Sequence, residues 1–369
     1  MSLSYVVLTP GLTGRDGIAR ASRLIVSALR LPAATASEHV RALAMNDPPG
    51  MPFPNDHTGA IHLAGAGGRK SRFVVSALLA VLGRARPPEV LCLHLHMSPL
   101  AWMVAGSRSR LTAFLWGIEA WRPLERMERW ALSRADILIA ISEHTARRFC
   151  EANPAFASRP IRICHLGVAG RPATAAPLAQ ANERPWSAPF ALIVGRMAAD
   201  ERYKGHDLLI DIWPRIVVEL PEARLVVAGD GDDRGRLERK AAVLGKRVTF
   251  LGHVSDLALE ALYRDCAFFV MPSRNEGFGL VFVEAMRAGK ACIGSVGAAA
   301  EVIEDGVTGF VVDPDEPGQV LQAMLRLFRE SETRERMGQA GALRMGQHFT
   351  EEHFRCRFRA ILGLGAEPA

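Results

Sequence analysis

The sequence predicts an α/β protein built from two doubly wound, Rossmann-like domains. Short β-branched or apolar runs alternate with longer helical patterns, which is typical of parallel sheets with crossover helices. The alternation stops at residues 171–188, where Ala, Pro and polar residues carry little periodicity, and then restarts. A chain of 369 residues is also too long for one ordinary core.

The first domain is expected to cover residues 1–170. Its predicted strands are 5–8, 60–63, 90–93, 111–115, 137–141 and 161–164, with helical patterns at 19–29, 69–82 and 124–134. The most apolar stretch, 73–83, is too short to span a bilayer and is interpreted as a core helix. The first residues lack the pattern of a signal peptide and are interpreted as the start of a strand.

A second domain is expected over residues 189–348, after a linker at 171–188. Its predicted strands are 190–194, 224–228, 248–251, 267–270, 291–293 and 310–312, with helices at 205–218, 233–243, 257–263 and 280–288. The chain reads as helical from Gln319 with a break near Thr350, so residues 349–369 form a last helix that we expect to pack back on the first domain. Ligands bind at the carboxyl ends of such strands, so the site is expected where the two domains face each other across a cleft.

Composition excludes several classes of protein. Six cysteines show no C-x-x-C spacing, and several lie in apolar runs, so we expect reduced thiols in a cytoplasmic protein rather than a disulfide scaffold or a zinc ribbon. The net charge of +6 is uneven: residues 1–184 hold 22 Lys+Arg against 12 Asp+Glu, and residues 185–369 hold 23 against 27. The basic half suggests an anionic partner, and without a nucleic-acid-binding motif a membrane surface is favoured over nucleic acid.

The segment 273–286, SRNEGFGLVFVEAM, is the richest in chemistry. It follows an apolar run, turns through Gly277 and Gly279, and enters a helix whose first N–H groups favour a phosphate. Glu276 and Glu284 are eight residues apart, so their backbones lie about 10 Å from each other, which suits a ligand with hydroxyls at both ends, such as a sugar nucleotide. A glycine turn with a solvated Glu on each side is the alternative.

Together with other segments, this motif resembles a known family. The pattern E-x7-E is joined by GRM at 195–197 with KG at 204–205, GDG at 229–231, GHV at 252–254, and EVI with DGVTG at 301–309. Their order resembles the retaining family 4 glycosyltransferases, relatives of glycogen synthase and the mannosyltransferases, which have the GT-B fold. The resemblance is dense over 190–315 and looser in the first domain.

The resemblance implies a role for each matching residue. Arg196 and Lys204 would clamp the diphosphate of a nucleotide-sugar, and Glu284 would hold the ribose hydroxyls. Val254 would lie near the base, and Gly17, at the end of a glycine-rich loop, would face the donor phosphate. The transferred sugar and its phosphate would be held by Glu276 and the backbone of Gly277, Phe278, Gly279 and Leu280.

The sequence departs from the family at one position. Many relatives carry a histidine after the strand that matches 111–115, and here the residue is Trp116, which cannot take a proton. His94 and His96, at the end of the strand expected at 90–93, are alternative polar groups, and Glu119 is another candidate. The catalytic candidates are therefore Glu276, Arg196, Lys204 and His96, and the acceptor-side candidates are Trp116 and Glu119.

No metal and no cofactor are expected. Residues 229–233, GDGDD, contain D-x-D, but a turn whose Asp side chains cap the next helix explains the pattern better than a metal site. The nucleotide-sugar, such as GDP-mannose or UDP-glucose, is a substrate.

We therefore predict a retaining hexosyltransferase, with mannose or glucose favoured. Its nucleotide would bind the second domain and its hydroxyl acceptor mainly the first. The acceptor is expected to be a lipid-linked oligosaccharide in bacterial exopolysaccharide or other cell-surface glycan synthesis, at the inner face of the membrane. A solvated basic surface is the alternative to membrane contact. A non-catalytic nucleotide-sugar-binding or scaffold protein is the alternative function, and an epimerase would need acid–base residues that the sequence does not identify.

Overall fold

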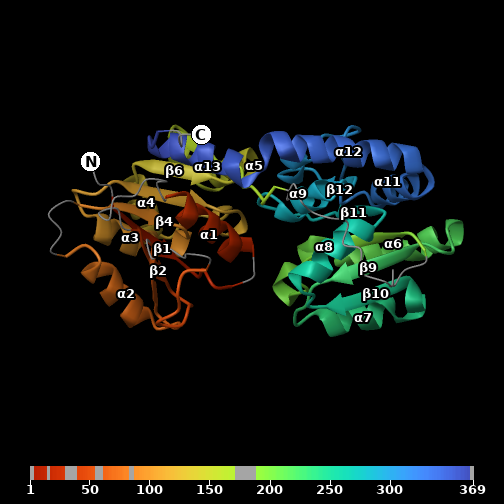
Figure 1. Cartoon of the computed structure of the whole chain (residues 1–369), viewed down its shortest axis with the longest axis horizontal. Coiled ribbons are helices and arrows are strands. Elements are labelled where there is room, and N and C mark those ends of the chain that lie inside the picture. The colour runs from red at the N-terminus through yellow and green to blue at the C-terminus, as the bar shows by residue number, and fades with distance from the viewer. Residues whose placement is uncertain are drawn as a thin grey trace. The chain divides into compact units, whose positions relative to one another are not determined.

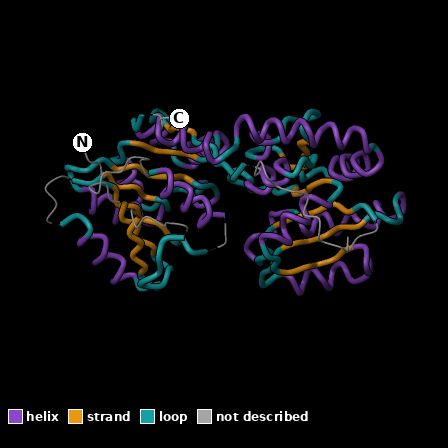
Figure 2. The backbone as a smooth tube through the Cα atoms, in the orientation of Figure 1, coloured by secondary structure: helices purple, strands orange, loops and turns teal. Residues whose placement is uncertain are grey.

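The computed structural model describes residues 4–14, 17–29, 40–54, 61–82, 87–170 and 188–365, and it divides the chain into two compact units. One unit joins Met1–Leu166 to Glu351–Ala369, and the other is Gly167–Thr350. The linker expected at 171–188 lies outside the described residues, apart from Ala188. Both units have strands flanked by helices (Figures 1 and 2).

The described part of the N-terminal unit contains a seven-stranded parallel sheet of order β3-β2-β1-β4-β5-β6-β7. Its strands are β1 (Tyr5–Thr9), β2 (Val40–Ala44), β3 (Ile61–Gly65), β4 (Glu89–Cys92), β5 (Leu111–Leu115), β6 (Ile137–Ala140) and β7 (Ile161–Ile163). Tyr5 pairs with Val40 on one side and with Glu89 on the other, which places β1 between β2 and β4. Both β1 and β5 are buried along their whole length, as expected for a sheet covered on both faces.

Helices surround this sheet and include the last helix of the chain. They are α1 (Gly17–Ala28), α2 (Lys70–Leu79), α3 (Ser98–Ala105), α4 (Arg126–Ser133), α5 (Glu143–Ala152) and α13 (Glu351–Leu362), with short 3₁₀ turns η1 (Leu95–Met97), η2 (Ile118–Ala120) and η3 (Pro154–Phe156). Figure 1 shows blue α13 among the red-to-yellow elements of this unit. Arg359 donates a hydrogen bond of 3.4 Å to the Ala28 carbonyl, and the rings of Phe358 and Phe114 are 5.8 Å apart.

The core helix expected at 73–83 packs only one of its faces into the core. In α2 only Phe73 and Ala77 are buried, whereas Val75 and Leu79 are more than half exposed, as is Leu82 just beyond the helix. The apolar run supplies one stripe for the core and a second stripe for the surface. Neither the length nor the hydropathy of the run shows which of its apolar residues are buried.

The described part of the C-terminal unit holds a six-stranded parallel sheet of order β10-β9-β8-β11-β12-β13. Its strands are β8 (Phe190–Val194), β9 (Arg224–Ala228), β10 (Val248–Gly252), β11 (Phe268–Met271), β12 (Cys292–Ser295) and β13 (Gly309–Val312). The helices are α6 (His206–Glu219), α7 (Arg234–Ala241), α8 (Asp256–Asp265), α9 (Leu280–Arg287), α10 (Ala299–Val302), α11 (Pro317–Arg329) and α12 (Ser331–His348), with 3₁₀ turns η4 (Ala199–Lys204) and η5 (Ala242–Arg247). The α12 helix ends at His348 and α13 starts at Glu351, so the break expected near Thr350 is present.

Side-chain packing and backbone approach fix the position of α9, which follows the richest motif. Phe282 of α9 is buried against Phe269 of β11, with ring centroids 5.4 Å apart. On the other side α12 comes so close that a Cβ at Gly338 would lie 2.0 Å from the Gly289 carbonyl oxygen. A residue larger than glycine at 338 would push α12 away from the end of α9.

The structure bears on the expected absence of a membrane-spanning helix and on the expected state of the cysteines. Among the described residues, no helix is long and apolar enough to cross a membrane. The six cysteines are free thiols, of which Cys92, Cys164, Cys266 and Cys292 are buried. Cys356 is exposed, so the core position expected of several cysteines does not extend to it.

Candidate functional site

The two cations expected to clamp a diphosphate lie on one loop and share one carboxylate. Arg196 follows β8, and Lys204 ends η4. Glu201 lies between them: its Oε2 is 3.0 Å from the Lys204 Nζ and 3.1 Å from the Arg196 Nε, and Arg196 Nη2 also bonds Oε1. Burial alone would raise the pKa of Glu201, but the hydrogen bonds from Arg196 and Lys204 outweigh it and lower that pKa. Sequence reasoning missed Glu201, although its position three residues before Lys204 was visible.

The loop that carries these cations is fastened to the turn after β9. Gly195 N–H donates to the Ala228 carbonyl at 3.0 Å, and Met197 N–H donates to the Asp230 carbonyl at 2.9 Å. A Cβ at Gly231 would lie 2.1 Å from the Met197 carbonyl oxygen, so this close approach requires glycine. The turn at 229–231 therefore supports the loop of residues 195–204, which we call the cation loop.

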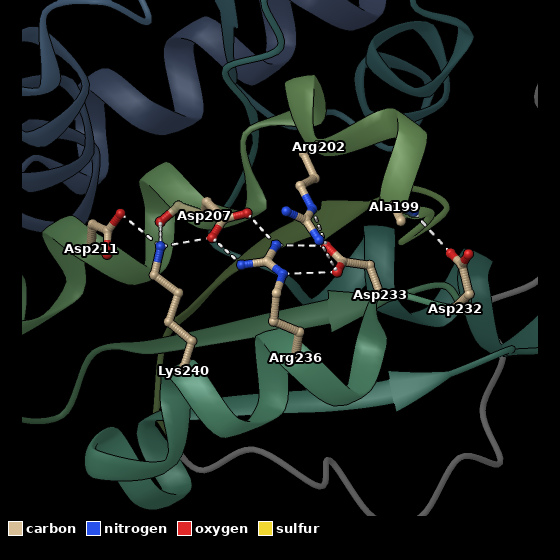
Figure 3. A network of polar contacts seen from close by, with 8 residues as sticks. All are labelled: Ala199, Arg202, Asp207, Asp211, Asp232, Asp233, Arg236 and Lys240. Carbon is tan, nitrogen blue, oxygen red and sulfur yellow. Dashed lines mark hydrogen bonds and ion pairs between the residues drawn. The ribbon is translucent and has the colours of Figure 1, made fainter.

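The aspartates of GDGDD fasten the same loop, and the expectation that they cap the next helix is wrong in detail. Asp233 occupies the N-cap of α7, but its side chain makes no capping hydrogen bond. Its carboxylate instead accepts from Arg202 at 3.0 Å and from Arg236 at 2.6 Å, while Asp232 accepts from the Ala199 N–H at 2.8 Å (Figure 3).

The same network continues into α6. Arg236 donates to both carboxylate oxygens of Asp207, and Lys240 bridges Asp207 and Asp211 at 2.7 and 2.8 Å (Figure 3). Hydrogen bonding to Arg236 and Lys240 holds the pKa of Asp207 well below its ordinary value. Within the described ranges, no group of three or more His, Cys, Asp or Glu residues could hold a metal ion.

A backbone hydrogen bond holds the turn that carries Glu276 against the cation loop. Arg274 N–H donates to the Tyr203 carbonyl at 2.9 Å, which ties the turn before α9 to the residue before Lys204. Burial raises the pKa of the Glu276 carboxyl, and the nearby Lys204 ammonium opposes that shift. The structure thus brings Arg196, Lys204 and Glu276 to one place, and their role in donor binding remains a prediction.

The glycine turn that starts α9 is closely packed, and its Gly277 N–H donates to Glu276 Oε1 at 3.2 Å. Gly279 is the N-cap with φ of +88°, and a Cβ there would lie 2.5 Å from the Phe282 ring. The Phe278 ring is buried against Phe349, with centroids 5.8 Å apart, so this residue can offer a ligand its backbone only. Leu280 then begins the helix, where free N–H groups favour an anion.

Glu284 lies inside α9, with 4% of its surface exposed. Its Oε2 accepts a 3.0 Å hydrogen bond from the buried Tyr263 hydroxyl on α8. Burial and the Glu284 carboxylate raise the pKa of Tyr263 far above its ordinary value, so this hydroxyl remains a donor. Sequence reasoning missed Tyr263.

Val254, expected near the base, follows β10 and is partly buried.

In the N-terminal unit, Gly17 is the exposed first residue of α1. The loop before it is held by Asp47, whose carboxylate accepts from the Leu12 N–H at 2.7 Å and from the Thr13 hydroxyl at 2.8 Å. Asp47 follows β2, a strand that the sequence pattern did not reveal. The support of this loop was therefore missed as well.

Trp116 is 5% exposed, and its indole N–H donates to the Leu93 carbonyl. Its ring stacks on Phe114, with centroids 5.8 Å apart. This placement favours packing over contact with a sugar, and the acceptor-side role of Trp116 remains a prediction. Glu119 accepts from the Trp116 backbone N–H at 2.8 Å, and burial raises the pKa of its carboxyl.

His96 lies on η1, directly after β4, and its side chain is 57% exposed. Its Nδ1 is 2.9 Å from Oε1 of the buried Glu128, a residue that sequence reasoning did not single out. His96 and Glu119 interact electrostatically, since His96 lowers the pKa of Glu119 against the larger effect of burial. The polar candidates of this unit thus gather at the carboxyl ends of β4 and β5.

Comparison with known proteins identifies the C-terminal unit. Residues 188–330 match the family described as glycosyl transferases group 1. The chain is 33% identical over 153 residues to a phosphatidyl-myo-inositol mannosyltransferase of Mycobacterium leprae, covering 41% of this chain and 40% of that protein. Residues 188–330 of this chain are therefore similar to the group 1 glycosyltransferases.

A second relative aligns over more of the chain. It is the GDP-mannose-dependent monoacylated alpha-(1-6)-phosphatidylinositol monomannoside mannosyltransferase of Corynebacterium glutamicum, 28% identical over 57% of each chain. The alignments therefore span about two fifths to three fifths of these relatives' lengths.

The likeness in fold extends over nearly the whole chain. HepE of Anabaena, solved with UDP and glucose, superposes with a TM-score of 0.74 at 18% identity, over 97% of this chain and 99% of that one. The predicted GT-B fold, with two Rossmann-like domains, is confirmed, and the match over residues 188–330 supports the predicted family.

Proposed function

We propose that this protein transfers a hexose from a nucleotide-sugar to a hydroxyl acceptor with retention of configuration. The observation that carries the proposal is the joining of Arg196, Lys204 and Glu276 through Glu201 and the Tyr203–Arg274 backbone contact. Such a site offers two cations, a carboxylate and helix N–H groups to one anionic sugar ligand. Few other ligands require all three.

Each group has a chemical task in this proposal. Arg196 and Lys204 stabilise the negative charge that develops on the leaving nucleoside diphosphate, where it grows in the transition state. Glu276 accepts hydrogen bonds from sugar hydroxyls, and Glu284, oriented by Tyr263, accepts them from the ribose. The acceptor hydroxyl attacks from the face that the diphosphate leaves, and the leaving phosphate assists its deprotonation.

The donor is proposed to carry mannose or glucose, as in GDP-mannose or UDP-glucose. A GDP-mannose-dependent relative and a structural neighbour with UDP and glucose support both possibilities. The acceptor is proposed to be lipid-linked, within exopolysaccharide or other cell-surface glycan synthesis. Two relatives named for phosphatidylinositol acceptors support a lipid partner.

A membrane-facing surface is part of the proposal, with the protein on the cytoplasmic side. Arg69, Lys70 and Arg72 are exposed at the start of α2, next to the exposed Val75 and Leu79. Basic side chains beside apolar ones suit anionic headgroups and the boundary of the acyl chains.

The deciding experiment is a transfer assay with the full chain. Radiolabelled GDP-mannose, UDP-glucose and UDP-N-acetylglucosamine are each incubated with the protein, with and without a lipid extract. Donor-dependent release of nucleoside diphosphate and a labelled lipid product are expected with one of them. Tight donor binding without transfer or hydrolysis would contradict the proposal and favour a nucleotide-sugar-binding or scaffold protein.

A further inference from the structure

Glu128 is a buried carboxylate with four hydrogen-bond contacts, three of which are to N–H groups that can only donate. It lies on α4, with 2% of its surface exposed. Arg122 donates to Oε1 at 2.8 Å and to Oε2 at 2.9 Å, and the Glu125 N–H donates to Oε2 at 3.0 Å. The fourth contact is His96, whose Nδ1 is 2.9 Å from Oε1.

We propose that Glu128 is a positioning residue that fixes His96 in the tautomer with its proton on Nδ1. An ionised carboxylate can only accept, so the ring nitrogen that faces it must carry the proton. Burial alone would raise the pKa of Glu128, but the hydrogen bonds from Arg122, Glu125 and His96 outweigh it, so the carboxylate stays ionised. The inference rests on the proposed function, in which His96 is a candidate to contact the acceptor.

Arg122 neutralises the charge of Glu128, so Glu128 does not need a charged His96 as its partner. The guanidinium contacts both oxygens of Glu128, so the pair has no net charge, and the carboxylate does not require a second cation. Arg122 Nη2 also lies 3.3 Å from His96 Nδ1, but the carboxylate is closer and sets the tautomer.

The surroundings of His96 leave its second ring nitrogen available. His94 is 5.2 Å away, centroid to centroid, and burial and His96 lower its pKa to about 4, so it is neutral at ordinary pH. Among the described residues none forms a hydrogen bond with His96 Nε2, and the side chain is more than half exposed.

The consequence is a fixed lone pair at the carboxyl end of β4. With the proton held on Nδ1, Nε2 can accept a hydrogen bond from an acceptor hydroxyl and orient it for attack. Trp116, at the end of the neighbouring strand, cannot accept a proton, so the Glu128–His96 pair supplies the accepting group from another strand. In other proteins too, a carboxylate that accepts a hydrogen bond from one nitrogen of a histidine orients the ring and raises the basicity of the other nitrogen.

The test reads the tautomer directly. The full chain, labelled with ¹⁵N-histidine, is recorded by long-range ¹H–¹⁵N NMR at about pH 8.5, above the ordinary histidine pKa of about 6.5. His96→Gln assigns the signals. The wild type is expected to show the Nδ1–H form at His96.

The matched variants are Glu128→Gln and Glu125→Gln. A glutamine at 128 can still accept from the Glu125 N–H, so the start of α4 is kept, but its amide no longer fixes the proton of His96. Glu128→Gln is expected to shift His96 toward Nε2–H and to reduce kcat about 10–100-fold. Glu125→Gln removes an exposed charge from the same helix start and should change neither.

The outcomes separate the two proposals. An Nε2–H form in the wild type would overturn the inference, whatever becomes of the variants. So would an unchanged tautomer or an unchanged kcat in a folded Glu128→Gln protein. Absence of transfer by the wild type would contradict the proposed function instead, because the NMR readout needs no substrate.

Discussion

Glu201 and Lys204 form an ion pair of 3.0 Å within the loop that is expected to bind the donor diphosphate. The same carboxylate also pairs with Arg196, so both cations already have an anionic partner. A diphosphate that binds here must compete with Glu201 for them.

Removing this competitor should strengthen nucleotide binding. Glu201→Gln leaves Arg196 and Lys204 in place without their counter-charge, and we expect UDP or GDP to bind about five-fold more tightly, or about 1 kcal/mol. Isothermal titration calorimetry measures this. Asp200→Asn, an exposed neighbour, is the control for loss of one negative charge. Weaker binding in Glu201→Gln would mean that the carboxylate holds the cations in position instead.

Loss of either cation should impair donor use with the fold intact. Arg196→Ala and Lys204→Ala should each raise the activation barrier by about 2–4 kcal/mol, because charge-assisted contacts strengthen as the diphosphate leaves. The measurement is kcat/KM for the donor beside the melting temperature. Lys246→Ala, an exposed lysine on η5, should behave as the wild type. Near-normal turnover in the Arg196/Lys204 double variant would remove both residues from the site.

Chelation should leave activity unchanged. Asp232 and Asp233 bond the Ala199 N–H, Arg202 and Arg236, so both are engaged in supporting the cation loop. Transfer after EDTA treatment and desalting is expected to match the untreated enzyme. Full loss, restored by Mn²⁺ or Mg²⁺, would instead make Asp230 and Asp232 metal ligands.

Tyr263→Phe should affect nucleoside binding more than phosphate binding. It removes the hydroxyl that orients Glu284 and leaves a buried oxygen short of one donor, at a cost of about 1–3 kcal/mol in stability. UDP and GDP should bind more weakly, while inorganic pyrophosphate should bind as before. Equal weakening of all three in calorimetry would show that the loss comes from disruption of α9 as a whole.

The sequence predicted the fold well where hydrophobic patterns were long. Strands such as β8 and β9 were placed to the residue, because uninterrupted apolar runs are typical of strands buried on both faces. β2 was missed because Arg41 interrupts a short run, and with it Asp47 was missed. The surface stripe of α2 was also missed, since hydropathy does not tell which apolar residues find a partner.

Sequence reasoning singled out the candidate ligand-binding residues but not the residues that support them. Arg196, Lys204 and Glu276 were singled out because they lie in glycine-flanked motifs. Tyr263 was not, because an aromatic residue in a helix has no local signature of a partner 21 residues away, as Glu284 is. Glu201 was overlooked although it is three residues from Lys204, because the spacing does not show that one carboxylate bonds both cations. Such pairings depend on tertiary structure.

The last prediction concerns the exposed apolar stripe of α2. Val75 and Leu79 are 55% and 57% exposed, and Arg69 and Lys70 lie at the start of the same helix. Each basic residue near an anionic surface contributes about 1 kcal/mol, and the apolar side chains add burial at the acyl boundary. The full chain should therefore co-sediment with phosphatidylglycerol vesicles at low salt, release at high salt, and bind neutral phosphatidylcholine weakly.

Matched variants assign this binding to α2. Val75→Ser with Leu79→Ser should lower vesicle binding about ten-fold, as should Arg69→Gln with Lys70→Gln, while the melting temperature stays near that of the wild type because these side chains are exposed. Leu343→Ser, at a 68% exposed leucine of α12 in the other unit, is the control and should bind as the wild type does. Equal binding to neutral and anionic vesicles, or none to either at low salt, would contradict the membrane surface and favour a soluble acceptor.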